Sequence, residues 1–305
     1  MREYIAPYLE HVLGNTWCIV TGYCRIPLYL ADRSQAVMID SGLRDPDQKP
    51  ILELLEREKI HVAALLTSHF HRDHVGNHEA IKARHGCTIY MTPYCAIIGQ
   101  DPANLRFSGY ETYTMSKARG LYPQRTHDEI IPWEAESITV CGYRFGLIWL
   151  PGHAVEQLGF VTPDDVAYLS DTLLCDQAMS KIRMPYCTHC GLDFAAKESL
   201  RGKIHKRYIL AHNAVCEEID GLIDRNLAYM QERLAIVENA ADAWMSMDTL
   251  CAVAMAKMGT DLNHIIKVIG AKRNLQVLIE HLVETGRLVA RVREGYIEYI
   301  AANCQ

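Results

Sequence analysis

The sequence has no long apolar segment and no cluster of basic residues. Among its 305 residues, no apolar run approaches the roughly 20 residues that a membrane-spanning helix needs. The formal net charge is −6, whereas nucleic-acid binding relies on clustered Lys and Arg side chains that neutralise phosphates. We therefore expect neither a membrane nor a nucleic acid as the main partner.

The sequence also shows neither the cysteine pattern expected of a disulfide framework nor the residue pattern expected of a secretory leader. Its 11 cysteines are odd in number and scattered without a regular spacing. No charged segment followed by an apolar segment of signal-peptide type stands near the start. These absences predict a cytoplasmic protein whose cysteines are reduced.

Two parts of different character follow one another along the chain. In the first, short apolar runs alternate with turn signals, and "QAVMIDSG", the helical "DPDQKPILELLEREKI" and "HVAALLT" follow one another in β-α-β order. From about Gly221 the pattern changes to three long helical stretches and a hairpin around "REG". With 49% hydrophobic residues, the chain can bury one large core and a small second domain. We predict domains over residues 1–219 and 220–305.

The second part resembles a winged-helix domain in its order of three helices and a hairpin. From Asp220 onward it contains nine Lys and Arg but eleven Asp and Glu, and a DNA-binding module would need the opposite balance. This composition favours packing, a dimer contact or a wall of an active site. Nucleic-acid binding through this domain is kept as an alternative function, and a homodimer is left open.

Four metal-ligand side chains stand within six residues in "HFHRDH", directly after an apolar strand. They are His69, His71, Asp73 and His74. Imidazole and carboxylate groups bind divalent metals, and a loop between a strand and a helix can direct several of them at one point. Packing has little use for such a group, and burying it without a metal would be costly. Three further ligand types stand at later strand ends: His153, Asp171 and His212.

The motifs "TSHFHRDH", "PGH", "SDT" and a final strand-end histidine, in this order, resemble the metallo-β-lactamase superfamily over about residues 10–215. The resemblance implies an α+β fold, a four-layer αββα sandwich with its site at one edge of the two sheets. It also implies that a first metal is held by His69, His71 and His153. A second metal would be held by Asp73, His74 and His212, with Asp171 bridging the two.

Two adjacent divalent cations lower the pKa of a bridging water and polarise a carbonyl oxygen. Together with the resemblance, this chemistry implies a dinuclear hydrolase, and the sequence looks most similar to the hydroxyacylglutathione hydrolase-like and lactonase-like branch. In it, a metal-bridging hydroxide would attack an ester, thioester or lactone of a small-molecule substrate. We expect zinc, although iron and manganese suit the same ligands. Asp73 is the predicted catalytic residue, orienting the nucleophile and carrying a proton to the leaving group.

One alternative reaction, catalysed by a related group of enzymes, is also compatible with the motif. Persulfide dioxygenases have a similar "HxHxDH" motif but bind a single iron, so a mononuclear iron oxidoreductase is the alternative enzyme. Flavodiiron proteins have an acid in place of His71, which argues against that branch. Family members often have Gly after the last histidine, where this chain has Asn213.

Substrate contacts are assigned to two further groups. Lys181 and Arg183 follow Asp171 by about one loop and could hold a carboxylate or phosphate. Tyr110 and Tyr113 could form a lid over an organic substrate. "CTHC", with Cys187 and Cys190, has metal-ligand spacing, but no partner pair for a four-ligand zinc site is evident.

Overall fold

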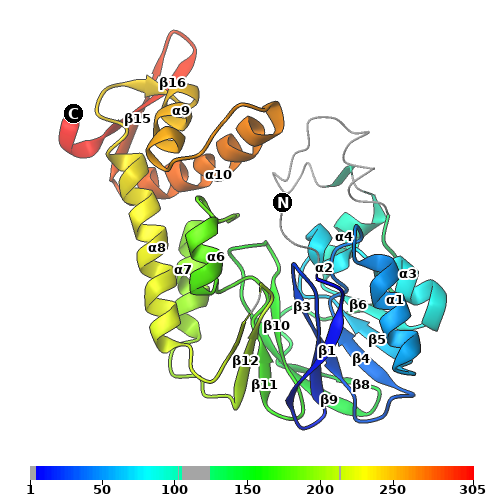
Figure 1. Cartoon of the computed structure of the whole chain (residues 1–305). Helices are drawn as coiled ribbons and strands as arrows, with labels where there is room; N and C mark the ends of the chain where they lie inside the picture. The colour runs from blue at the N-terminus through cyan, green and yellow to red at the C-terminus, as the bar shows by residue number, and fades with distance from the viewer. Residues whose placement is uncertain (1–4, 102, 105–123, 213) are drawn as a thin grey trace.

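Two β-sheets face each other in the computed structural model, which describes residues 5–101, 103–104, 124–212 and 214–305 (Figure 1). The seven-stranded sheet has the order β1-β2-β3-β4-β5-β6-β7. Its strands are β1 (Tyr8–Leu13), β2 (Thr16–Val20), β3 (Arg25–Tyr29), β4 (Ala36–Ile39), β5 (Val62–Leu66), β6 (Thr88–Met91) and β7 (Glu129–Ile130). The six-stranded sheet has the order β13-β12-β11-β10-β9-β8. Its strands are β8 (Ser137–Val140), β9 (Tyr143–Trp149), β10 (Leu158–Val161), β11 (Val166–Tyr168), β12 (Arg207–Leu210) and β13 (Ala214–Cys216).

Helices cover the outer face of each sheet. Apolar side chains of α1 (Gln48–Arg57), α3 (His78–His85) and α4 (Pro93–Gln100) form one buried cluster with the seven-stranded sheet. Those of α7 (Cys190–Ser199) and the first turns of α8 (Asp220–Glu238) form another with the six-stranded sheet. A third cluster, including Phe145, Phe160 and Tyr168, fills the space between the sheets. The chain thus has the α+β class and the αββα layers that were expected (Figure 1).

The β-α-β pattern of the first part follows from where its apolar residues lie. β4 and β5 are parallel, and their residues are almost entirely buried, which explains why their sequences are nearly continuous apolar runs. Between them, α1 buries Ile51, Leu54 and Leu55, the spacing of one helix face. This arrangement directs the loop after β5, which carries the "HFHRDH" motif, to one edge of the sandwich.

The carboxyl ends of several strands meet at that edge. β9 and β11 are both antiparallel to β10, and β12 is parallel to β11, so these three strands point the same way. The two sheets are joined there by hydrogen bonds. The amide of Leu158 donates to the carbonyl of Ser68 (2.9 Å), and the hydroxyls of Ser68 and Ser170 are 2.9 Å apart. Loops from both sheets are therefore held together at one place.

The C-terminal part forms a fourth hydrophobic cluster and has its own small sheet. Its elements are α8, α9 (Met247–Lys257), α10 (Ile265–Glu284), β14 (Met245–Ser246), β15 (Leu288–Arg293) and β16 (Tyr296–Ala301), with the sheet order β14-β16-β15. The predicted boundary coincides with the start of α8 at Asp220, whose later residues Met230, Leu234 and Val237 belong to this cluster. The domain limits and the winged-helix assignment stay predictions.

Some elements were not anticipated from the sequence. They are β1, α4, α6 (Asp176–Lys181) and α7, which are short or lack a clear apolar period. The long run "SITVCGYRFGLIWLPGH" is two strands, because Cys141 and Gly142 both have positive φ and reverse the chain. α10 begins at Ile265, ahead of the "LQVLIEHLVETG" pattern, where the His264 side chain caps the amide of Ile266. Within the described part of the chain, no helix has both the length and the apolar character needed to cross a bilayer.

Candidate metal centre

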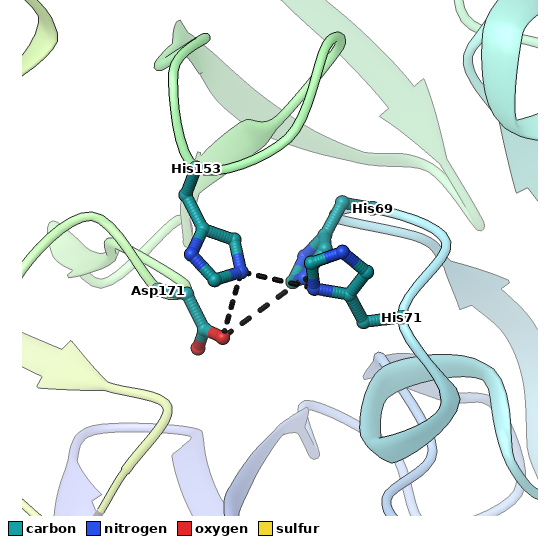
Figure 2. Close-up of side chains that lie close together, drawn as sticks. All are labelled: His69, His71, His153 and Asp171. Carbon is teal, nitrogen blue, oxygen red and sulfur yellow. Dashed lines mark hydrogen bonds and ion pairs between the residues drawn. The ribbon is translucent and has the colours of Figure 1, made fainter. Parts of the chain in front are cut away.

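Three imidazoles and a carboxylate converge at the joined edge of the two sheets. His71 Nδ1 lies 2.9 Å from His69 Nε2 and 2.9 Å from His153 Nε2. Asp171 Oδ2 lies 3.2 Å from His153 Nε2 and 4.0 Å from His69 Nε2. Figure 2 shows these four side chains pointing toward one another from three different loops. They form a group that could hold one metal ion.

A second group shares the same carboxylate. Asp171 Oδ1 is 3.4 Å from His74 Nε2, and Asp171 Oδ2 is 3.4 Å from His212 Nε2. Asp73 Oδ2 is 3.6 Å from His212 Nε2. The seven ligand positions expected from the sequence thus come together, and Asp171 lies between the first group and the second.

The residues fit bound divalent cations. A neutral imidazole has one N–H, yet His71 Nδ1 contacts two other ring nitrogens at once. His74 Nε2 and Asp171 Oδ1 are buried and make no hydrogen bond, although buried polar atoms normally have a partner. Nitrogen and carboxylate oxygen are the donors that zinc and iron take in proteins. Cations among these atoms would explain both features.

Asp40 orients the second group from behind. It follows β4 with a φ of 62°, and its Oδ2 accepts from His74 Nδ1 (2.8 Å) and from the Tyr168 hydroxyl (2.7 Å). Its other oxygen accepts from the amide of Ser68 (2.8 Å). A carboxylate behind a histidine fixes the ring's tautomer and makes it a better ligand. The sequence analysis did not assign Asp40 to the site, although an acid at a strand end, like Asp171, was the available signal.

The far nitrogens of the other rings are also held. His153 Nδ1 lies 3.1 Å from the Tyr186 carbonyl oxygen, and His212 Nδ1 lies 3.0 Å from that of Tyr23. His69 Nδ1 lies 3.1 Å from the Ser68 hydroxyl. Each contact leaves the Nε2 atom directed at the centre, which is the orientation that ligation requires.

Gly152 places His153 in its loop. Its φ is 135°, and a Cβ atom there would lie 2.3 Å from the Asp193 Cα. The Gly152 carbonyl accepts from the amide (2.7 Å) and hydroxyl (2.8 Å) of Thr188. Only glycine allows this close approach of the "PGH" loop to α7.

The charge states follow from burial and from Asp171. Burial lowers the pKa of His69 and His71 well below the usual value, so both rings are neutral. Burial opposes protonation of His74 and His212, but their neighbours together outweigh it and raise both pKa values well above the usual value: Asp171 and Asp40 act on His74, and Asp171 and the Cys24 thiol act on His212. Burial would raise the pKa of Asp171, yet the neighbouring histidines, His212 first, hold that pKa well below its usual range.

The centre opens into a cavity of about 390 Å³, a size that suits a small organic ligand. His71, Asp73, His153, Asp171 and His212 line one side. Arg273 and Asn274 of α10 also line the cavity, together with the buried ion pair between Asp193 and Lys197. Tyr186 lines the cavity as well, and the Arg273 guanidinium lies 5.1 Å from the centre of its ring.

The predicted substrate residues lie at different distances from this cavity. Lys181 ends α6 and lines a smaller hollow of about 160 Å³ together with Tyr23, Asp73 and His212. Arg183 is exposed and does not line either hollow, and its carbonyl accepts from Arg233 Nε (3.1 Å). Tyr110 and Tyr113 lie outside the described residues. The sequence analysis did not find Arg273 or Tyr186, since nothing in their local pattern marks them.

The remaining ligand-type candidates are structural in this fold. Cys187 and Cys190 are buried beside each other, and no third potential ligand joins them in the part of the chain that the structure describes. Their thiols face the Gly152 carbonyl (3.5 Å) and the Val277 carbonyl (3.9 Å). His78 is buried between the hydroxyls of Ser41 (2.8 Å) and Thr67 (2.9 Å), so it packs rather than ligates.

The fold and this cluster of histidines and acids define a class of protein. Residues 27–174 match the family model of the metallo-beta-lactamase superfamily, which is the superfamily that the sequence motifs resemble. A metallo-beta-lactamase family protein from Thermus thermophilus has a TM-score of 0.72 at 16% identity, covering 97% of this chain and 98% of that one. A beta-lactamase domain protein from Burkholderia ambifaria has a TM-score of 0.72 at 14% identity, covering 96% and 93%.

Relatives found by sequence similarity are named hydroxyacylglutathione hydrolases. A hydroxyacylglutathione hydrolase from Chromohalobacter salexigens is 28% identical over 141 residues, 46% of this chain and 43% of the relative. One from Pseudoalteromonas translucida is 25% identical over 157 residues, 52% of this chain and 45% of the relative. The chain therefore spans less than half the length of these relatives. The matches support the expectation of a metal-dependent hydrolase.

Proposed function

We propose that this protein is a dinuclear metal-dependent hydrolase that cleaves a thioester, ester or lactone of a small organic molecule. The observation that carries the proposal is the position of Asp171, whose two oxygens face His153 and His212 on one side and His74 on the other. A carboxylate shared by two ligand groups can bridge a pair of metal ions, which is what a two-metal hydrolase would use. The superfamily match and the named relatives support the same reaction class.

The ligand sets follow from the two groups. His69, His71 and His153 would hold the first cation, while Asp73, His74 and His212 would hold the second, with Asp171 shared. When bound, two such cations supply an acidic bound water and a Lewis acid for the carbonyl oxygen. The loops at the sheet edge hold the ligands in place, and backbone carbonyls hold the rings of His153 and His212. The ligand side chains would therefore move little when cations bind.

Asp73 is the acid–base candidate. Its carboxylate lines the cavity and lies beside His212, with its side chain 18% exposed, so it can contact both water and substrate. In this position it would orient the attacking water and then donate a proton to the leaving thiolate or alkoxide. The deeper acid, Asp171, is 6% exposed and is surrounded by histidines, which suits ligation rather than proton transfer.

A cationic side chain of α10 in the cavity wall suggests an anionic substrate. Arg273 of α10 lines the cavity, and a guanidinium binds a carboxylate through two parallel hydrogen bonds. Lys197 lines the same cavity, where its ammonium is paired with Asp193. We therefore propose an acyl compound that carries a carboxylate several bonds from the scissile carbonyl.

The test is hydrolysis by protein purified without chelator and supplied with zinc, against a panel of thioesters, lactones and phosphodiesters. A matched His71→Ala variant reports the background. Zinc-dependent cleavage of thioesters or lactones that the variant loses is the expected result. If instead the protein carries one iron per chain and consumes oxygen with a persulfide, it is a mononuclear dioxygenase and the proposal is wrong.

A further inference from the structure

Cys24 reaches the second ligand group from a turn that the motif analysis did not include. The turn connects β2 to β3, and its two ends are joined, because the amide of Thr21 donates to the Cys24 carbonyl (2.9 Å) and the amide of Cys24 donates to the Thr21 hydroxyl (2.9 Å). Cys24 is only 2% exposed. Its Sγ atom, a carboxylate oxygen of Asp73 and a ring nitrogen of His212 all lie within 4.8 Å of one another.

The backbone fixes this turn to the strand that carries His212. The amide of Arg25 donates to the Ala211 carbonyl (2.8 Å), one residue before the histidine. The carbonyl of Tyr23, one residue before the cysteine, lies 3.0 Å from His212 Nδ1. The thiol and the imidazole therefore sit in a framework that sets their separation. Cys24 Sγ also lies 3.6 Å from the Asp73 carbonyl oxygen, so it is held against α2 (Arg72–Val75).

His212 also belongs to a neighbouring ligand group, with His74 and Asp171, in which two buried atoms lack a hydrogen bond. His74 Nε2 is buried without a hydrogen bond and lies 3.4 Å from Asp171 Oδ1, which is likewise buried without one. His212 Nε2 is shared between this pair and the Asp73 side of the group. Thiol, carboxylate and imidazole are all zinc ligands, and a Cys, an Asp and a His around one point make a plausible ligand set.

We propose that Cys24 is a thiolate ligand of the second metal, beside Asp73 and His212. The assignment rests on the proposed dinuclear function and adds a ligand to it. On binding, the S–H bond breaks, the proton goes to solvent and a sulfur–metal bond forms, with no oxidant or reductant involved. A sulfur donor favours zinc over manganese or magnesium, which prefer oxygen. The second position would therefore select zinc more strongly than the first.

The chain offers a matched control thiol. Cys175 Sγ lies 3.4 Å from the His212 carbonyl oxygen, so it contacts the same histidine from its backbone side. It is partly exposed and is not a member of a ligand group. Replacing it removes a nearby sulfur but leaves every side chain of the proposed ligand set in place.

The test is the absorption spectrum of metal-free protein loaded with two equivalents of Co(II), with cobalt per chain measured on the same samples. Bound thiolate gives cobalt a strong charge-transfer band in the near ultraviolet. Wild type and Cys175→Ser should show the band, while Cys24→Ser should lose it. Cys24→Ala provides a second variant in case the serine protein does not fold.

Two outcomes would overturn the assignment: a wild-type protein without the band, whatever its cobalt content, or a band that persists in the Cys24 variants. The readout needs no substrate, so it separates the two proposals. A Cys24-dependent band without thioester or lactone cleavage would leave the ligand in place and reject the reaction. Zinc-dependent cleavage without the band would support the reaction and reject Cys24 as a ligand.

Discussion

Asp171 is a nearly buried acid whose ionised form is stabilised by histidines on two sides. In the absence of cations, that arrangement collects positive charge on His74 and His212. The neutral rings of His69 and His71 and the orphaned nitrogen of His74 show that the same atoms would serve cations better than protons. At the scale of single residues, the centre therefore has the character of a ligand set for metals.

Asp40 should control how tightly the second metal binds. Asp40→Asn keeps the shape and the left-handed backbone but weakens the hydrogen bond to His74 Nδ1, so we expect metal affinity to fall about 10- to 100-fold. Competition with a chromophoric chelator measures it. Asp165→Asn is the matched control, because Asp165 also has positive φ and pairs with a histidine, His205 (2.7 Å), outside the ligand groups. Equal affinities in both variants would contradict the role given to Asp40.

Metal binding should release protons. Because Asp171 raises the pKa of His74 and His212 well above the usual value, both rings are protonated in the metal-free protein near neutral pH. Ligation needs the neutral rings, so zinc uptake should acidify an unbuffered solution, and zinc affinity should fall as the pH falls from about 8 to 6. A pH indicator and zinc titrations at several pH values measure both. Uptake without proton release, at an affinity independent of pH, would show that the charge assignment is wrong.

Asp73 should affect turnover more than ligation alone would explain. Asp73→Asn retains an oxygen donor but cannot donate or accept the proton, so we expect kcat to fall about 100-fold or more. Metal content is measured on the same sample, and Asp176→Asn, an exposed acid paired with Arg225, serves as the control. An Asp73→Asn protein that keeps two metals and full turnover would remove Asp73 from the acid–base role.

At the scale of elements, the centre is a product of loops held by strands of two sheets. The "HFHRDH" loop follows β5, and His153, Asp171 and His212 follow β9, β11 and β12, whose ends share one edge. The opposite wall comes from α10, which lies far along the chain from all of these loops. A helix of the second part thus completes the cavity of the first.

Arg273 should set substrate affinity. Arg273→Gln removes a charge-assisted contact of roughly 1.5–3 kcal/mol, so KM for a carboxylate-bearing thioester should rise about tenfold or more while kcat changes little. A neutral thioester of equal length should show no such rise. Lys267→Gln, on the same helix and away from the cavity, is the control. A KM that responds equally for both substrates would indicate that Arg273 only supports the wall.

The sequence predicts those residues of the centre that a short motif or a strand end identifies. "HFHRDH" places four ligands within six residues, and the strand ends before His153, Asp171 and His212 are visible as apolar runs that stop at a polar residue. Asp40, Cys24 and Arg273 were not found, because each reaches the site through the packing of segments far apart in the chain. A single acid, thiol or guanidinium carries no local pattern that distinguishes such a role.

At the scale of the whole molecule, an αββα sandwich and a helical C-terminal part share one cavity. The net charge of −6 is not reflected in the cavity, where Arg273 and Lys197 stand opposite the acids of the ligand groups. This arrangement supports an enzyme acting on a small anion better than a nucleic-acid reader. The location of the protein in the cell, its oligomeric state and the winged-helix character of residues 220–305 stay predictions.

The most direct test of the central claim is the rate of thioester or lactone hydrolysis by metal-free protein as zinc is added in measured equivalents. The account predicts little activity without metal and a rate that rises until two zinc ions per chain are bound, because both ligand groups share Asp171. A rate that is complete at one equivalent, or no hydrolysis at two, would contradict the dinuclear hydrolase.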